Sequence, residues 1–167
     1  TYTGATNISA GQVTLDVSGT IENSSSVAVA GTLAIDAAKS INNLSGAGNV
    51  TLSGDLTVTS NSDTTFSGAI GGGSGLVKAG ASRLTLTGLN SYTGTTTINA
   101  GTLTTNEQAI DDSGAITFGG TATLNTTESF SYGNTVTLSS TNTFDVDNAT
   151  TLTLSGQVTG SGALTKT

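Results

Sequence analysis

The sequence predicts an all-β protein, and among all-β architectures it favours a parallel β-helix, in which short strands coil into stacked rungs. Apolar residues alternate with small polar residues in many short runs along the whole chain. Turns rich in Gly, Ser and Asn separate these runs, and no segment has the pattern of a stable helix. The chain also repeats its own sequence at a fixed offset, which is typical of a repeat architecture.

The internal repeat aligns without a gap. Residues 1–13 return as residues 91–103, so that Tyr2 corresponds to Tyr92, and residues 66–78 return as residues 154–166. In such architectures function usually belongs to a surface. We expect residues 1–167 to form a single β-helical segment of a longer array, with a partial repeat at 1–13, a full repeat at 66–103 and a partial repeat at 154–167.

The strand-like runs place apolar side chains on one face and mostly Thr or Asp on the other, as an alternation of period two requires. In chain order they are residues 13–17, 33–35, 50–52, 56–58, 84–86, 116–118, 136–138, 144–146 and 152–154. With runs roughly every six to nine residues, three runs make a rung of roughly 20 to 24 residues. The sequence therefore predicts about seven to eight rungs and, at ~4.8 Å per rung, a rod roughly 35 Å long.

An antiparallel β-sandwich is the alternative. It would use Asn-Gly or Asp-Gly hairpins and large aromatic core residues, whereas both dipeptides are absent and the core candidates are mostly Val, Leu, Ile and Ala. The absence of proline also fits internal rungs, whose backbone N–H groups all donate. We expect the four phenylalanines in the core and the asparagines stacked into amide ladders between rungs. These asparagines are Asn42, Asn43, Asn90, Asn99, Asn142 and Asn148.

The composition excludes several classes of function. The net charge is −7 and the chain has only four cationic side chains, which argues against binding to nucleic acid or to anionic lipid. No apolar run is long enough to cross a bilayer, so we expect no direct membrane insertion by this segment. The absence of Cys and His removes disulfides, thiolate metal sites and the usual activated nucleophiles. We therefore expect no enzyme activity, no cofactor and no metal.

Residues 66–103 carry an extended motif of glycines, a lysine, a Leu-Thr-Leu run, an asparagine and a tyrosine. The matching positions are Gly75, Leu76, Lys78, Gly80, Leu84, Thr85, Leu86, Gly88, Asn90, Tyr92, Gly94, Thr96, Ile98, Gly101 and Leu103. This motif resembles the passenger-associated transport repeat, also called the autotransporter-associated β-strand repeat, of bacterial autotransporter passenger domains. The chain departs from the family pattern at Ser82, Arg83 and Thr95, which all lie in expected turns.

The resemblance implies a right-handed β-helical stalk that is anchored in the parent protein to the outer membrane and lies outside the cell, at the bacterial surface. Such passengers serve in adhesion, self-association or the display of another domain. The leading hypothesis is accordingly a structural stalk or adhesive module. Its expected partners are further copies of itself, end to end or laterally, and host-cell or matrix glycans. The alternatives are a carbohydrate-binding or polysaccharide-cleaving β-helix and a passive spacer that assists secretion.

Four residues are candidate surface contacts. Tyr2 and Tyr92 occupy the same repeat position, where exposed rings would form a stripe for stacking on glycans, but we favour rings packed over the neighbouring rung beside Gly4 or Gly94. Asp145 and Asp147 leave the same face of a strand, and paired carboxylates can cleave a glycosidic bond. No cation is near them in the sequence, so we favour solvated carboxylates. Residues 111–114 offer oxygen ligands for Ca²⁺ but lack a calcium-binding repeat pattern.

Overall fold

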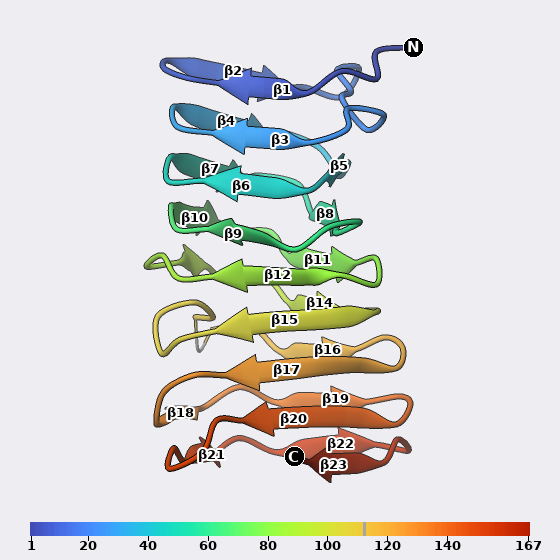
Figure 1. Cartoon of the computed structure of the whole chain (residues 1–167), viewed down its shortest axis with the longest axis vertical. Coiled ribbons are helices and arrows are strands. Elements are labelled where there is room, and N and C mark those ends of the chain that lie inside the picture. The colour runs from blue at the N-terminus through green and yellow to red at the C-terminus, as the bar shows by residue number, and fades with distance from the viewer. Residues whose placement is uncertain (112) are drawn as a thin grey trace.

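The computed structural model describes residues 1–111 and 113–167, and in that part of the chain it shows strands and turns but no helix. Every strand pairing found there is parallel and joins a strand to its counterpart one turn away, as between β1 (Thr6–Ile8) and β3 (Val27–Val29). In Figure 1 the near strands run to the left and the far strands to the right as the chain descends, so the coil is right-handed. The parallel β-helix is confirmed, and the sandwich alternative is wrong.

The coil has three sides, and the number of turns can be counted from the strands of the first side. In residues 1–111 and 113–167 this side has nine strands that make eight turns, which confirms the predicted seven to eight. Paired residues on this side are 17 apart at Val27 and Leu44 and 22 apart at Phe144 and Lys166, so some turns are shorter than predicted. The strands of the first side are β1, β3, β6 (Leu44–Gly46), β9 (Thr64–Phe66), β12 (Arg83–Leu86), β15 (Gly101–Thr105), β17 (Ala122–Thr126), β20 (Asn142–Val146) and β23 (Leu164–Lys166).

The other two sides are less regular. The second side holds β2 (Gln12–Leu15), β4 (Thr32–Ile35), β7 (Asn49–Leu52), β10 (Ala69–Gly72) and β13 (Ser91–Tyr92), and resumes lower down with β18 (Phe130–Tyr132) and β21 (Leu152–Leu154). Between these two sheets, residues 106–111 form turns in place of a strand. The third side holds β5 (Lys39–Asn42), β8 (Leu56–Thr59), β11 (Leu76–Ala79), β14 (Thr96–Ile98), β16 (Ile116–Phe118), β19 (Val136–Leu138) and β22 (Val158–Gly160).

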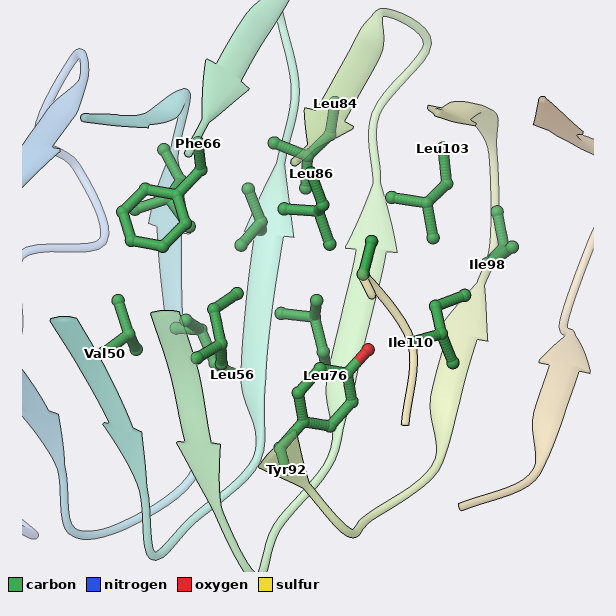
Figure 2. Packing of buried hydrophobic residues seen from close by; sticks show 14 of the residues in the cluster. Val50, Leu56, Phe66, Leu76, Leu84, Leu86, Tyr92, Ile98, Leu103 and Ile110 are labelled. Carbon is green, nitrogen blue, oxygen red and sulfur yellow. The ribbon is translucent and has the colours of Figure 1, made fainter. Parts of the chain in front are cut away.

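The core is a stack of inward side chains from all three sides, and Figure 2 shows several of them pointing into one interior. On the first side Leu84, Leu103, Leu124 and Phe144 lie above one another on successive turns and are buried. The four phenylalanines are all buried, as predicted. The predicted alternation therefore correctly separates core from surface along most strands.

Two features at the corners fix the spacing between turns. At the corner between the first and second sides, a Cβ on Gly68 would lie 1.8 Å from the Gly48 carbonyl oxygen, so only glycine allows the turns to approach this closely. Asparagine amides bridge turns by bonding to backbone groups. Asn90, for example, accepts from Ile70 N–H (2.8 Å) and donates to Ala109 O (2.8 Å). No amide-to-amide bond joins two asparagines in the described residues, so the predicted amide ladders are wrong.

The sequence repeat and the structural turn do not coincide. The strand β1 lies on the first side, whereas β14, its counterpart 90 residues later, lies on the third side. Likewise β2 lies on the second side and its counterpart β15 on the first. The offset of 90 residues thus spans four turns plus two further sides. Repeated sequences consequently face different directions and do not build one continuous surface stripe.

Candidate functional site

The outer face of the first side carries a ladder of polar side chains from successive turns. Arg83 on β12 donates from Nη1 to Thr104 Oγ1 (2.8 Å) and to Asn125 Oδ1 (3.2 Å). Thr104 also donates to Asn125 Oδ1 (3.0 Å). Thr104 and Asn125 are buried although they point away from the core, because their neighbours in the ladder cover them. We call Arg83, Thr104, Asn125, Asp145 and Asp147 the polar ladder.

The two predicted carboxylates lie at the lower end of this ladder. Asn125 Nδ2 donates to Asp145 Oδ2 and to Asp147 Oδ1, each at 3.2 Å. A single amide therefore holds both carboxylates on the same face, as the alternation of the strand predicts. Thr167 Oγ1 makes a further, long contact of 3.4 Å to Asp145 Oδ1.

A cation that is far away in the sequence is linked to these carboxylates through one amide. Arg83 is 62 residues from Asp145 in the sequence, yet both bond to the same Asn125 side chain. Sequence reasoning did not find Asn125, Thr104 or Arg83 as members of one group. The sequence signal is an inward apolar residue between two outward polar residues. It recurs on successive turns as Thr102-Leu103-Thr104, Thr123-Leu124-Asn125 and Thr143-Phe144-Asp145.

The surface beside the carboxylates is only a wide, open depression. It encloses about 490 Å³ and is lined by Asp145, Val146, Asp147, Asn148 and Thr167, with no tyrosine among them. A comparable open depression of about 500 Å³ lies near the top of the third side, where Lys39 Nζ donates to Val17 O (3.3 Å). The groove that the polysaccharide-cleaving alternative needs, with a tyrosine on one flank of Asp145 and Asp147, is thus not assembled at this depression.

The two predicted tyrosine contacts differ from each other. Tyr92 is 1% exposed, and its hydroxyl bonds to Thr96 Oγ1 (2.7 Å) inside the coil; burial raises the pKa of Tyr92 to about 12. Tyr2 is 54% exposed, bonds through its hydroxyl to Ala5 O, and lies against Gly4. Because Tyr92 is inside the coil, the two rings do not form an exposed stripe, and only Tyr2 is accessible as a surface contact.

The three lysines all occupy inward positions of the coil. Lys39 pairs with Leu56, Lys166 with Phe144, and Lys78 lies between Val58 and Ile98 in adjacent turns. Lys78 is fully buried, and burial lowers its pKa to about 8, against a smaller opposite influence of Asp63.

The ammonium of Lys78 has three backbone acceptors. Nζ donates to Ala79 O (2.9 Å) and Gly80 O (2.8 Å) at the adjoining corner, and to Ala100 O (3.0 Å) on the next turn. All three ammonium protons have an acceptor, so this lysine ties two turns together instead of offering a reactive amine.

The possible calcium ligands at residues 111–114 do not form a metal site in the described part of the chain. Asp111 Oδ1 accepts from Ser113 N–H (2.7 Å), and these hydrogen bonds from Ser113 lower the pKa of Asp111. Asp112 lies outside the described residues. Within residues 1–111 and 113–167 no three Asp or Glu side chains gather as metal ligands do.

Comparisons with known proteins support the same interpretation. The family model of passenger-associated transport repeats matches residues 1–16 and 76–104, so these two segments are similar to such repeats. The further partial repeat at residues 154–167 stays a prediction. No match to the chain was found among curated proteins or among solved structures. The described residues contain no helix that is long and apolar enough to cross a membrane. The repeat and the β-solenoid together fit the stalk of an autotransporter passenger, which is a secreted or surface-exposed class of protein.

Proposed function

We propose that this chain is a stiff stalk segment of a bacterial surface protein and that it acts in self-association and adhesion. The observation that supports this most directly is the uninterrupted ladder of nine parallel strands on the first side. At ~4.8 Å per turn its eight turns extend about 38 Å. Along an inner strand, alternate residues hydrogen-bond to the turn above and to the turn below, which makes a rod that resists bending.

The surface chemistry supports a structural role in preference to catalysis. The two depressions beside the outward strand positions are wide and open. The buried lysine has three backbone acceptors, and Asp145 and Asp147 are held by an amide. We find no arrangement of a nucleophile with an activating base around these groups.

Binding to glycans is a second candidate function, and one observation favours it. The polar ladder exposes an arginine at one end and two carboxylates at the other, over successive turns of one face. Such donors and acceptors match the hydroxyls of an extended saccharide lying along the rod. The Asp145→Asn variant removes a charge while keeping the shape of the side chain, so it separates specific recognition from packing.

Display on living bacteria tests the proposal. The chain is fused to an outer-membrane anchor that lacks its own passenger, and displaying cells are mixed with equal numbers of differently labelled cells without it. Self-association predicts clumps that contain displaying cells only, whereas adhesion to a common surface glycan predicts clumps of both kinds. If displaying cells stay dispersed and bind no glycan on an array, the passive-spacer alternative is favoured and our proposal is wrong.

A further inference from the structure

We infer that the outward face of the third side docks laterally against the same face of a second copy of this chain. This inference rests on the proposed self-association and names the face that carries it. A seven-stranded sheet from β5 to β22 builds this face along the flank of the rod, so the face does not depend on the first or the last turn (Figure 1). We call its outward column from Ser40 to Thr159, which includes Thr57, Thr97, Thr117 and Thr137, the threonine column.

The outward positions of these seven strands carry no charged side chain. Both lysines of the sheet, Lys39 and Lys78, occupy inward positions, and the outward residues are small polar or apolar ones. The first side instead carries the charges of the polar ladder, and the second side is interrupted by residues 106–111, which include two carboxylates. Because each copy has a net charge of −7, the third side is the flank on which two copies approach with the least repulsion.

The hydroxyl groups of the threonine column are available to a partner. Within residues 1–111 and 113–167, the hydroxyls of Thr57, Thr97 and Thr117 have no hydrogen-bond partner, and all three side chains are half-buried. In the polar ladder, by contrast, Thr104 already donates to Asn125 Oδ1 (3.0 Å). A hydroxyl both donates and accepts, so two facing columns can bond to each other while their methyl groups pack between them.

The spacing along the rod is the same in both copies, because each turn contributes one side chain to the column about every 4.8 Å. Two such faces can interdigitate over their whole length with the sheets about 10 Å apart. Asp55 lies beside the face, at the corner before β8, where its Oδ1 accepts from Gly75 N–H of the next turn (2.7 Å). The contact therefore rests on hydroxyl and methyl groups along the column and leaves this carboxylate at its rim.

The area of the face sets the strength of the contact. Seven strands of three to four residues give a face about 34 Å long and about 10–13 Å wide, so two copies together bury roughly 700–900 Å². Stable complexes bury about 1,200–2,000 Å². A single pair of these faces therefore associates weakly, and many pairs acting together are needed to hold two cells. Higher ionic strength should strengthen this association, because it screens the repulsion between two acidic copies.

The test uses bacteria that display the whole 167-residue chain and carry distinguishable labels. Thr97 lies on β14, the middle strand of the seven, so it faces Thr97 of the second copy when the two faces overlap fully. Thr97→Asp and Thr97→Lys each place like charges across this contact, and clumping of cells that display only one of them should fall roughly tenfold. A mixture of the two variants places opposite charges there and should restore clumps that contain both labels. Both variants keep a negative net charge, so attraction between whole chains cannot explain such a rescue.

The matched controls are Thr85→Asp and Thr85→Lys, which make the same changes at an outward position of the first side and should leave clumping unchanged. If wild-type cells do not clump, both the self-association and this inference are wrong. If they clump and the Thr97 variants clump as well as the Thr85 variants, or if mixing Thr97→Asp with Thr97→Lys restores nothing, self-association stands and the choice of face is wrong. Clumps that form only with cells lacking the chain would identify a surface glycan as the occupant and would also overturn the inference.

Discussion

The sharpest structural prediction concerns Gly68, at the corner that follows β9. A methyl group there would lie 1.8 Å from Gly48 O, whereas real Cβ atoms essentially never come within 3.0 Å of such an atom. The obstacle is backbone of the preceding turn, so it cannot swing aside as a side chain can. The Gly68→Ala variant must therefore move two turns apart locally by more than 1 Å.

The cost follows from what holds these turns together. Ala69 N–H donates to Gly48 O at 3.2 Å, and this hydrogen bond is lost when the turns separate. A lost hydrogen bond costs about 1 kcal/mol, and overpacking typically adds about 1–3 kcal/mol. The sum is about 2–4 kcal/mol. For a chain of this size, that lowers the melting temperature by roughly 4–16 °C.

The matched control is Gly73→Ala, because a Cβ at Gly73 meets no atom within 4 Å. Replacing such a glycine restricts the unfolded chain and leaves stability unchanged or raises it by about 0.4–1 kcal/mol. Thermal and urea unfolding followed by circular dichroism measure both variants. Equal stability of Gly68→Ala and Gly73→Ala would refute the close stacking of turns on which the fold description depends.

Three further predictions concern buried polar groups. The first concerns Lys78, whose pKa is lowered to about 8 in the folded chain, so that between about pH 8 and 10.5 the unfolded chain binds more protons than the folded chain. The free energy of unfolding of the wild type should therefore rise with pH through this range, relative to that of Lys78→Met. Urea titrations in which this difference falls as the pH rises would contradict the prediction. Tyr92→Phe leaves the buried Thr96 hydroxyl without its partner and should lower stability by about 1–3 kcal/mol in thermal melts, whereas Tyr2→Phe should change it little. Asn125→Ala removes the amide that joins both ends of the polar ladder and should lower the free energy of unfolding in urea by about 1–3 kcal/mol. An unchanged free energy of unfolding would show that the hydrogen bonds of the ladder do not stabilise the fold.

Much of the fold is predictable because inward apolar and outward polar residues alternate along each strand of a β-solenoid. The Leu-Thr-Leu run at residues 84–86 places Leu84 and Leu86 inside and Thr85 outside, as the alternation predicts. The small, β-branched and glycine-rich composition also correctly favours stacked turns over a sandwich. These features depend on local periodicity, which a single sequence displays directly.

The side on which a residue lies depends instead on the summed lengths of all preceding turns. A turn of 17 residues between Val27 and Leu44 shifts everything after it, so the repeats that carry Tyr2 and Tyr92 end on different sides. The total length of the preceding turns cannot be inferred from any local sequence pattern. The polar ladder was missed for the same reason, because Arg83 and Asn125 meet only when two turns of the coil are counted correctly.

The inward lysines could not be inferred from hydrophobic alternation either. Lys78 breaks the apolar pattern of its strand, and its burial is tolerated because Ala79, Gly80 and Ala100 supply carbonyl oxygens. Those acceptors exist only once the corner and the following turn have formed. Sequence repetition between residues 66–78 and 154–166 also suggests that Lys78 and Lys166 are equivalent, yet they lie on different sides of the coil.

The central claim, a coil of stacked parallel turns, is tested most directly by distances between pairs of spin labels along the third side. The chain has no cysteine, so labels attach only to cysteines introduced at outward positions. Ser40, Thr57, Val77, Thr97, Thr117, Thr137 and Thr159 form one ladder of successive turns. With one label at Ser40, moving the second from Thr97 through Thr117 and Thr137 to Thr159 should lengthen the distance by about 4.8 Å per step, to about 29 Å for the last pair. Distances that do not increase steadily along this series would contradict the coil.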